Sequence, residues 1–315
     1  MNFNKEQVEQ KAKEIRINSL KMINAANSGH PGGSLSIADI LSVLYFGEQM
    51  NYDAKNPESE SRDVLVVSKG HASPAVYSAL GLAGFFPIED TMSFRQLGSQ
   101  FQGHIDRCRV PGVEMSTGSL GHGLSNALGI SLAIKLNEKN LLENSSDARL
   151  ANLEKPELTG SSMRISRDER NAAEEDLQVG SRTVFAILSD GELQEGSNWE
   201  AIMACAHYKA SNVICFLDRN RIQLDGWTET TMALHPIAEK FHAFNWEVIE
   251  INGHDVDAIN DAINKAKALR SGDKPICILA QTIKGKGVSF MEDNVAWHGV
   301  APNNADLEKA LVELK

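Results

Sequence analysis

Two short polar segments, each directly after an apolar stretch, carry side chains suited to hold a divalent cation. Asp190 and Gly191 follow the apolar stretch 183–188, and Asn220 follows the stretch 212–217. Mg²⁺ takes a few protein oxygens and completes its octahedron with phosphate oxygens and water. A carboxylate, an amide oxygen and a nearby backbone carbonyl therefore predict a site for a magnesium-bound diphosphate. Taken alone, Asp-Gly after a strand is most often only a turn.

The residues after Asp190 add features that favour an anion. Gly191 has no side chain, so an anionic ligand can approach its backbone closely. A helix is predicted to follow Glu195, and the free N–H groups at a helix N-terminus attract negative charge. Both features support a diphosphate at this loop.

Alternating strands and helices must position these loops. Five apolar runs are predicted as buried strands, at 63–67, 183–188, 212–217, 247–251 and 275–280. Helices are predicted over 4–27, 36–48, 199–208, 256–269 and 305–315. Apolar strands separated by helices are typical of a mainly parallel sheet with helices on both faces. We therefore expect one doubly wound α/β domain over residues 1–315, with ligands at the carboxyl ends of its strands.

The composition excludes several classes of protein. The chain has 315 residues, of which 42% are hydrophobic and 23% charged, and a net charge of −11, which disfavours a general nucleic-acid binder. No apolar run reaches the roughly 20 residues that span a bilayer, and the first ten residues lack an apolar signal region. The four cysteines show no C-x-x-C spacing, so we expect reduced thiols in a cytoplasmic protein.

One segment does not fit the alternating pattern. Residues 137–180 contain no aromatic side chain, ten acidic and six basic ones, and many Ser, Asn, Pro and Gly residues. This composition predicts an insertion that is either mobile on the surface or in contact with a partner. Short helices are compatible with 145–153 and 167–177.

The two loops and their flanking segments closely resemble transketolases, in the order of that family. The matching segments are SGHPGGSLSIADIL (28–41), SKGHASPA (68–75), FQGHIDR (101–107), STGSLGHGLSNALGISLA (116–133), SDGELQEGSNWEA (189–201), DRNRIQLDG (218–226), KGKGVSFMED (284–293) and AWHG (296–299). The resemblance covers nearly the whole chain outside the expected insertion. It implies the thiamine diphosphate-binding fold, and specifically the domain that binds the diphosphate.

The resemblance implies a role for particular residues. It implies that Asp190, Asn220 and the carbonyl of Ile222 ligate Mg²⁺, or another divalent cation such as Ca²⁺ or Mn²⁺. His71 and Gly191 would contact the diphosphate of thiamine diphosphate. The other cofactor contacts that it implies are Gly118 and Leu120 on the aminopyrimidine side, together with Glu195, Asn220 and His298.

Three histidines and a glutamate complete the implied catalytic set. His30, His104 and His298 would line the channel in which sugar hydroxyls meet the cofactor, and would move protons or donate hydrogen bonds there. Glu195 resembles the glutamate of the subunit interface that is thought to connect two active sites. His254 is interpreted as a residue that fixes a loop, and the remaining assignments are structural: His207, His235 and His242.

Two positions depart from the family pattern. Ser189 stands where the first glycine of G-D-G is usual, which puts the diphosphate geometry in question. Gln281 stands where several transketolases carry a lysine near the diphosphate. Gly285 and Gly287 are expected to form a tight loop whose neighbours, Lys284 and Lys286, are either solvated or face an acidic substrate or partner.

Thiamine catalysis also needs a domain that binds the pyrimidine, and no such domain follows AWHG. The resemblance therefore implies the N-terminal subunit of a split transketolase, which works with a C-terminal subunit in a heterotetramer of two plus two. The pair would transfer a two-carbon ketol unit from a ketose, or its phosphate, to an aldose, as in the pentose phosphate pathway.

Other readings stay open. The 1-deoxyxylulose 5-phosphate synthase and the first component of 2-oxo acid dehydrogenases share the fold, but ELQEGSNWEA, His30, His71 and AWHG favour the transketolase branch. One alternative is a subunit of a transketolase-like enzyme in a specialised secondary or catabolic pathway. Another is a degenerate, non-catalytic partner.

Overall fold

The computed structural model describes residues 3–153, 182–224 and 226–315. The strands are β1 (Val64–Val67), β2 (Val184–Ser189), β3 (Val213–Arg219), β4 (Glu247–Asn252) and β5 (Ile276–Gln281). The α-helices are α1 (Lys5–Ala26), α2 (Pro31–Leu35), α3 (Ala38–Phe46), α4 (Ser73–Leu82), α5 (Gly123–Leu153), α7 (Gly196–His207), α8 (Thr228–Thr231), α9 (Ile237–Ala243), α10 (Val256–Leu269) and α11 (Asn304–Glu313). Short 3-10 helices are η1 (Gly70–Ala72), η2 (Ile88–Ser93), η3 (Gly191–Gln194) and η4 (Val295–Trp297).

The five strands form one sheet in the order β1-β2-β3-β5-β4, and every pair is parallel. The predicted α/β class, with a parallel sheet between helices, is therefore confirmed. Ser189 pairs with Asp218, and Asp218 pairs with Ala280, so the ends of β2, β3 and β5 lie level. The loops that follow these strands consequently leave the sheet at one edge.

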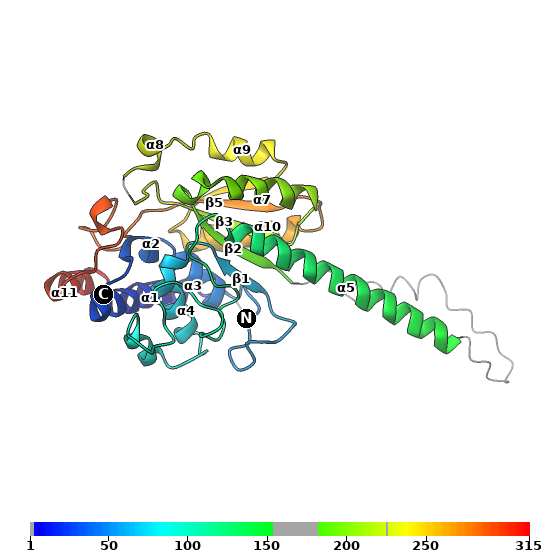
Figure 1. Cartoon of the computed structure of the whole chain (residues 1–315), viewed down its shortest axis with the longest axis horizontal. Helices are drawn as coiled ribbons and strands as arrows, with labels where there is room; N and C mark the ends of the chain where they lie inside the picture. Colours follow the sequence, from blue (N-terminus) through cyan, green and yellow to red (C-terminus); the bar gives the residue numbers. More distant parts are fainter. Residues whose placement is uncertain (1–2, 154–181, 225) are drawn as a thin grey trace.

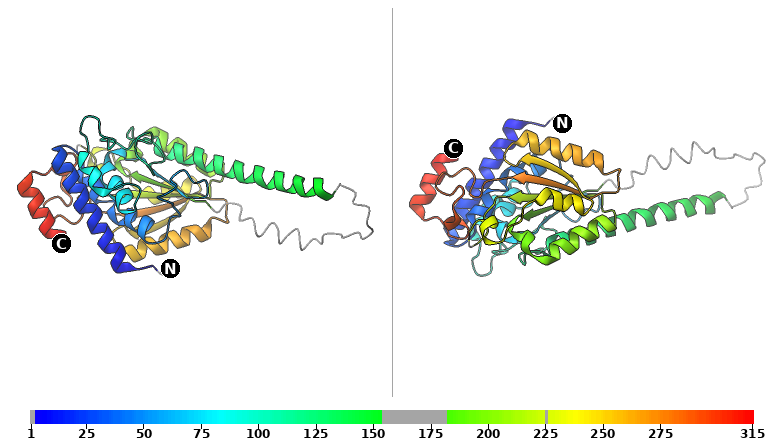
Figure 2. Two further views of the ribbon diagram at one scale, coloured as in Figure 1. Left: turned by 90° about the horizontal axis from the view of Figure 1, so that it is seen from below. Right: turned by 90° about the horizontal axis from the view of Figure 1, so that it is seen from above.

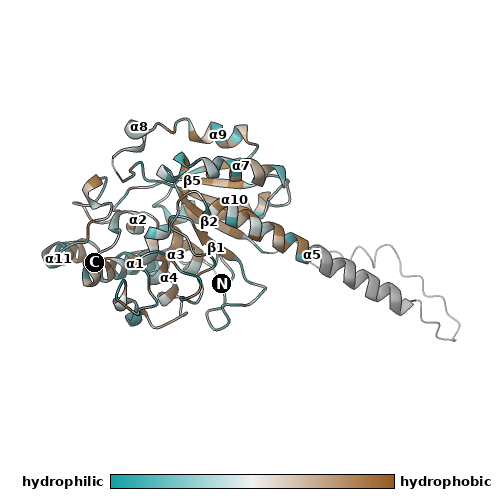
Figure 3. Ribbon diagram, in the orientation of Figure 1, coloured by the Kyte–Doolittle hydropathy of each residue, from teal (hydrophilic) through white to brown (hydrophobic). Residues whose placement is uncertain are grey.

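Side chains that alternate along each strand enter two separate cores. In β2, Phe185 and Ile187 pack with α1, α3, α4 and α10, whereas Ala186 and Leu188 pack with α5, α7 and α9. This division follows from the two-residue period of a strand. Figure 2 shows helices on both sides of the sheet, and Figure 3 shows hydrophobic residues along the strands between them.

The predicted helix boundaries are close to the observed ones where a cap is present. Asn4 caps α1 by accepting from the Gln7 N–H at 3.2 Å, and α10 begins after Asp255, as expected from Val256 onward. The predicted helix over 36–48 is shorter, and a separate short helix, α2, precedes it. Pro31 starts α2, because proline suits the first position of a helix.

The expected insertion begins inside a helix. α5 continues past residue 137 to Leu153 and extends well beyond the sheet, so the short helix expected at 145–153 is its last part (Figure 1). Leu, Glu, Lys, Ala and Arg dominate this stretch and are strong helix formers. The helix expected at 167–177 lies outside the described residues.

A third apolar cluster closes the end of the domain next to α1. Leu20 and Leu35 pack with Val288 and Met291 and with α11, which fixes the segment between β5 and α11 against the N-terminal helices. In the described part of the chain, no helix is long and apolar enough to cross a membrane.

Candidate functional site

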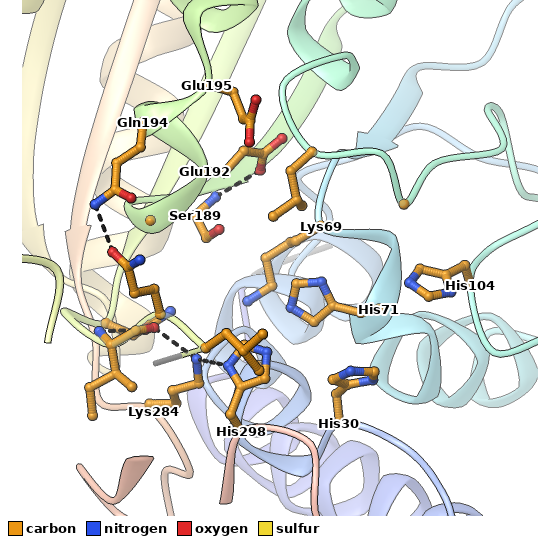
Figure 4. Close-up of a pocket in the computed structure, with 18 residues that line it drawn as sticks. His30, Lys69, His71, His104, Ser189, Glu192, Gln194, Glu195, Lys284 and His298 are labelled. Atoms are coloured by element: carbon orange, nitrogen blue, oxygen red, sulfur yellow. Dashed lines mark hydrogen bonds between the residues drawn. The ribbon is translucent and has the colours of Figure 1, made fainter. Parts of the chain in front are cut away.

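A pocket of about 300 Å³ opens at the carboxyl edge of the sheet (Figure 4). It is lined by His30, Gly33, Lys69, His71, His104, Gly118, Leu120, Ser189, Gly191, Glu192, Gln194, Glu195, Asn220, Ile222, Gln223, Leu224, Lys284 and His298. Every residue predicted for the cofactor or for catalysis lines this pocket. The predicted metal ligand Asp190 lies beneath it, almost fully buried.

The three predicted metal ligands lie on the loops after β2 and β3. The Asp190 carboxylate accepts hydrogen bonds from the N–H groups of Gly191 (2.9 Å) and Arg221 (2.8 Å), which joins the two loops. Burial, with Asp218 nearby, raises the pKa of Asp190 to about 6. A bound cation would favour the charged form of this carboxylate, because opposite charge lowers a carboxyl pKa.

A fully buried carboxylate beneath the pocket fixes the side chain of Asn220. Asp218 accepts from the Asn220 amide NH₂ at 2.8 Å and from the Lys69 ammonium at 2.5 Å. It also accepts from Ser36 at 2.9 Å and Thr282 at 2.5 Å. Since the amide nitrogen points at Asp218, the amide oxygen of Asn220 accepts from the Ile222 N–H at 3.2 Å and keeps a second lone pair for a ligand. Burial alone would raise the pKa of Asp218, but the Lys69 ammonium outweighs it and lowers that pKa.

The residues present fit a magnesium diphosphate. One carboxylate, one amide oxygen and one carbonyl form a partial oxygen shell that phosphate oxygens and water would complete. Within the described ranges no group of three or more His, Cys, Asp or Glu side chains could hold a metal by itself. Glycines leave room for the ligand, since a Cβ at Gly33 would lie 3.1 Å from His71 Nε2 and a Cβ at Gly191 would lie 3.0 Å from Gln223 Cβ.

Four histidines from four segments of the chain form a cluster on the other side of the pocket (Figure 4). The ring of His30 lies 5.2 Å from that of His71, 6.2 Å from that of His104 and 5.6 Å from that of His298, measured between centroids. The segments before α2, after β1, before α5 and before α11 supply one ring each. The sequence places these residues far apart, and the fold brings them together.

Burial keeps these imidazoles neutral. It lowers the pKa of His30 to about 4, with Arg95 and His104 adding to the effect. Burial, then Lys284, lowers the pKa of His298 to about 3. The pKa values of His71 and His104 are also lowered, mainly by burial. Neutral imidazoles can both donate and accept a hydrogen bond, which suits them to sugar hydroxyls.

Lys284 and Lys69 are site residues that the sequence reasoning did not assign. Lys284 is 3% exposed, lines the pocket, and donates to the Ile222 carbonyl at 2.8 Å and to His298 Nδ1 at 2.7 Å. Burial, then the charge of Lys69, lowers the pKa of Lys284 to about 7. The signal was the position of each lysine within a matching motif, SKGH and KGKG. Lys286, two positions after Lys284, instead pairs with Glu292 and is partly exposed.

Glu192 is a third residue that the sequence did not single out. Its side chain is 1% exposed, lines the pocket and accepts from Ser68, from the Gly121 N–H at 2.9 Å and from the Ser189 N–H at 3.2 Å. Glu195, by contrast, is exposed at the rim. Within its loop, Gly118 (φ +150°) lies close to His104.

The two departures from the family pattern have structural accounts. Ser189 is the last residue of β2 in strand conformation, pairs with Asp218 and has no positive φ, so its backbone does not require glycine. Gln281 does not line the pocket, because its side chain accepts from Arg219 at 3.4 Å. The buried lysines that line the pocket are Lys69 and Lys284 instead.

His254 occupies the position expected of a loop-fixing residue. Its Nδ1 lies 2.7 Å from the Asp39 carboxylate, and its Nε2 accepts from the Ile283 N–H at 2.8 Å, next to Lys284. The three histidines interpreted as structural do not line the pocket: His207, His235 and His242.

Comparison with known proteins identifies the class to which this fold and site belong. The family model "Transketolase, thiamine diphosphate binding domain" matches residues 7–149 and 159–314. The chain therefore belongs to the transketolase family and carries its thiamine diphosphate-binding domain. It is a transketolase subunit, and transketolases are thiamine diphosphate-dependent enzymes that transfer ketol groups.

Two relatives match along nearly their whole length. The chain is 36% identical over 308 residues to the 6-deoxy-6-sulfo-D-fructose transketolase subunit SqwG of Clostridium sp. (strain MSTE9), covering 98% of this chain and 96% of that one. It is 33% identical over 316 residues to an apulose-4-phosphate transketolase subunit from Actinobacillus succinogenes, covering 100% and 98%.

Solved transketolases share the fold over a fraction of their length. The transketolase of Campylobacter jejuni superposes with a TM-score of 0.79 at 32% identity, over 99% of this chain and 43% of that one. The Pichia stipitis transketolase in complex with sedoheptulose-7-phosphate gives a TM-score of 0.81 at 29% identity, over 98% and 41%. This chain thus spans about two fifths of each solved transketolase, whereas it matches the named subunits end to end.

Proposed function

We propose that this chain is the cofactor-binding subunit of a two-component transketolase. With a pyrimidine-binding partner subunit it transfers a two-carbon ketol unit from a ketose to an aldose. The observation that carries the proposal is the pocket that joins the oxygens of Asn220 and Ile222, above Asp190, to four neutral histidines. End-to-end similarity to two proteins named as transketolase subunits supports the two-component form.

The oxygen ligands hold the diphosphate end of the cofactor through a divalent cation, which we propose to be Mg²⁺. Asp190 supplies the negative charge, Asn220 an amide oxygen that is oriented by Asp218, and Ile222 a carbonyl. His71 and Gly191 bind the phosphate groups themselves, and Lys284 adds a positive charge beside them. When bound, thiamine diphosphate supplies the carbon nucleophile that the reaction requires.

The histidines orient the sugar and move its protons. Lys284 donates to His298 Nδ1, so the neutral ring carries its proton on Nε2 and can donate it to a sugar oxygen. Arg95 lies 3.5 Å from His30 Nδ1 and favours the same tautomer there. His104 stands beside His30 at the same side of the pocket. Glu195 is exposed at the rim, and its proposed role is to contact a neighbouring subunit.

We infer that the sugar carries an acidic group. One relative is named for a sulfonated fructose and another for a phosphorylated apulose. We therefore favour a transketolase of a specialised catabolic pathway over one of the pentose phosphate pathway. The proposed assembly is a heterotetramer of two plus two, in the cytoplasm, where the four unpaired cysteines would stay reduced.

The first experiment is to purify the tagged chain from its own host and record native mass spectra. We expect a second subunit, thiamine diphosphate and Mg²⁺ in one complex. The complex is then assayed with xylulose 5-phosphate, apulose 4-phosphate and 6-deoxy-6-sulfofructose as ketol donors. Rapid turnover of xylulose 5-phosphate alone would support the pentose phosphate pathway instead.

A matched pair of variants connects the complex to the proposed site. Asp190→Ala should abolish metal-dependent retention of the cofactor, whereas Asp273→Ala should not, because Asp273 pairs with Lys209 at the surface. A homo-oligomer that retains no cofactor and shows no ketol transfer would refute the proposal and favour a non-catalytic protein.

A further inference from the structure

Glu192 lies where three segments of the pocket wall meet. One carboxylate oxygen accepts from the Ser68 hydroxyl and from the Gly121 N–H at 2.9 Å, and the other accepts from the Ser189 N–H at 3.2 Å. Ser68 directly precedes Lys69 and lies close to His71 in the chain, and Ser189 directly precedes Asp190. Each bond of Glu192 therefore reaches a residue near a proposed binding group.

Glu192 also completes the start of α5. The Ser68 hydroxyl, which donates to Glu192, accepts from the Gly123 N–H at 3.1 Å. The first N–H groups of a helix have no partner within it. Here the N–H of Gly123, the first residue of α5, donates to Ser68, and the N–H of Gly121, two residues before the helix, donates to Glu192. A carboxylate near a helix N-terminus is also stabilised by the helix dipole. The loop 118–121 is fixed as a consequence.

The Gly121 peptide is held from its other side as well. Ser197 donates to the Gly121 carbonyl at 2.9 Å, so its N–H and its C=O are both bound to the segment 192–197. A Cβ at Gly121 would lie 2.5 Å from Ser197 Oγ and 2.8 Å from Glu195 Cβ. This close approach places the loop with Gly118 and Leu120 directly against Glu195.

We propose that Glu192 is a positioning residue that sets the aminopyrimidine side of the pocket relative to its diphosphate side. This inference rests on the proposed function. Both oxygens of Glu192 are occupied by donors of the protein, so it acts through the loop 118–121 rather than on the ligand. Ser197 assists it by fixing the same peptide.

The proposal predicts a selective loss of affinity in Glu192→Gln. The glutamine has nearly the same shape, but its NH₂ group must face either the Ser189 N–H or the donors Ser68 and Gly121. One buried donor is thereby left without an acceptor, and the loop 118–121 shifts. We expect thiamine diphosphate to bind about 10- to 100-fold more weakly, because binding must return the loop to its wild-type position and bury the unpaired donor again, which costs free energy in that range. Pyrophosphate with Mg²⁺, which probes the diphosphate end alone, should bind within about threefold of the wild-type affinity.

Both affinities are measured by calorimetry on the complex isolated from its host, after its cofactor and metal have been removed by dialysis against a chelator. Glu114→Gln is the matched control: it changes a partly buried carboxylate that pairs with Arg62 and lies outside this pocket, and should alter neither affinity. Ser197→Ala should reproduce the selective loss at about three- to tenfold. It also keeps the proposal testable if Glu192→Gln does not fold, which thermal melts will show.

The outcomes separate the two proposals. Equal losses for both ligands, or unchanged binding of thiamine diphosphate in Glu192→Gln and Ser197→Ala, would overturn the role of Glu192 while leaving the proposed function intact. Failure of the wild-type complex to bind thiamine diphosphate at all would overturn both.

Discussion

The buried ion pair between Lys69 and Asp218 offers a direct test of how the pocket is held together. The side chains are 1% and 0% exposed, and their charged atoms lie 2.5 Å apart. Replacing Lys69 by Met keeps the length and the apolar stem but leaves Asp218 buried without its cation. Three neutral donors remain for Asp218, from Ser36, Asn220 and Thr282.

The expected loss follows from the burial. Removing one partner of a buried pair costs about 3–5 kcal/mol, because the other charge stays desolvated. With an unfolding entropy of about 2.1 cal/mol/K per residue, 315 residues give about 0.66 kcal/mol/K, so Lys69→Met should lower Tm by about 5–8 °C. Calorimetry on cofactor-free protein measures this shift without a contribution from ligand binding.

A second substitution tests whether the loss of stability comes from the unpaired charge of Asp218. In Lys69→Met/Asp218→Asn the carboxylate becomes a neutral amide, so no unpaired charge stays buried. We expect the double variant to lose less free energy of unfolding than Lys69→Met and Asp218→Asn lose together, by at least about 1 kcal/mol. A Tm within about 1 °C of wild type in Lys69→Met, or strict additivity of the two losses, would refute the reasoning.

Three further predictions follow from the site. Ser189→Gly should keep the cofactor affinity within about twofold. Its free energy of unfolding in denaturant titrations should fall by about 0.5–1 kcal/mol, because glycine weakens a strand. A large gain in affinity would contradict the geometry of β2. Gly118→Ala should cost about 1–3 kcal/mol, since φ is +150° and the new Cβ would lie 2.7 Å from His104; unchanged melting would argue against this backbone. His298, with its pKa of about 3, is neutral when folded but protonated when unfolded below about pH 6.5, so the free energy of unfolding should fall as pH drops from about 6.5 toward 3. His298→Asn should flatten that fall in denaturant melts, and an unchanged pH profile would disprove the assignment.

The sheet could be predicted from the sequence because its strands are buried on both faces. Runs such as TVFAIL and NVICFL are apolar without alternation, which is the pattern of a central parallel strand. Even the strand at the β4 edge was placed, because Val248 and Ile249 lie within the repeating order of strands and helices. The extent of α5 was not placed, because a polar, aromatic-free composition is shared by exposed helices and by loops.

The residues that face the ligand could be predicted from the sequence, because their motifs indicate what they bind. The buried residues that hold them in position could not. Asp190 and Asn220 follow strands and carry oxygens, so their position and type indicated a role. Lys69 pairs with Asp218 across 149 positions and Glu192 accepts from Gly121 across 71 positions, and no local pattern reveals such partners. Lys284 was expected either to be solvated or to face an acidic substrate or partner. Its burial was not foreseen, because lysine is rarely buried, and the apolar cluster around Val288 and Met291 was needed to place it.

The order of the segments along the chain bears on when the pocket can form during synthesis. β1 pairs with β2 across about 120 residues. Among the described strands, β4 pairs with β5 alone, which follows it in the chain. Contacts between distant segments slow folding, because a long loop must close, at a cost in entropy, before the pairing of its strands can stabilise the structure. Lys284 and His298 come from the last of the segments that line the pocket. A ribosome-bound chain that still lacks those residues therefore has no complete pocket, and cofactor loading must follow synthesis of that part of the domain.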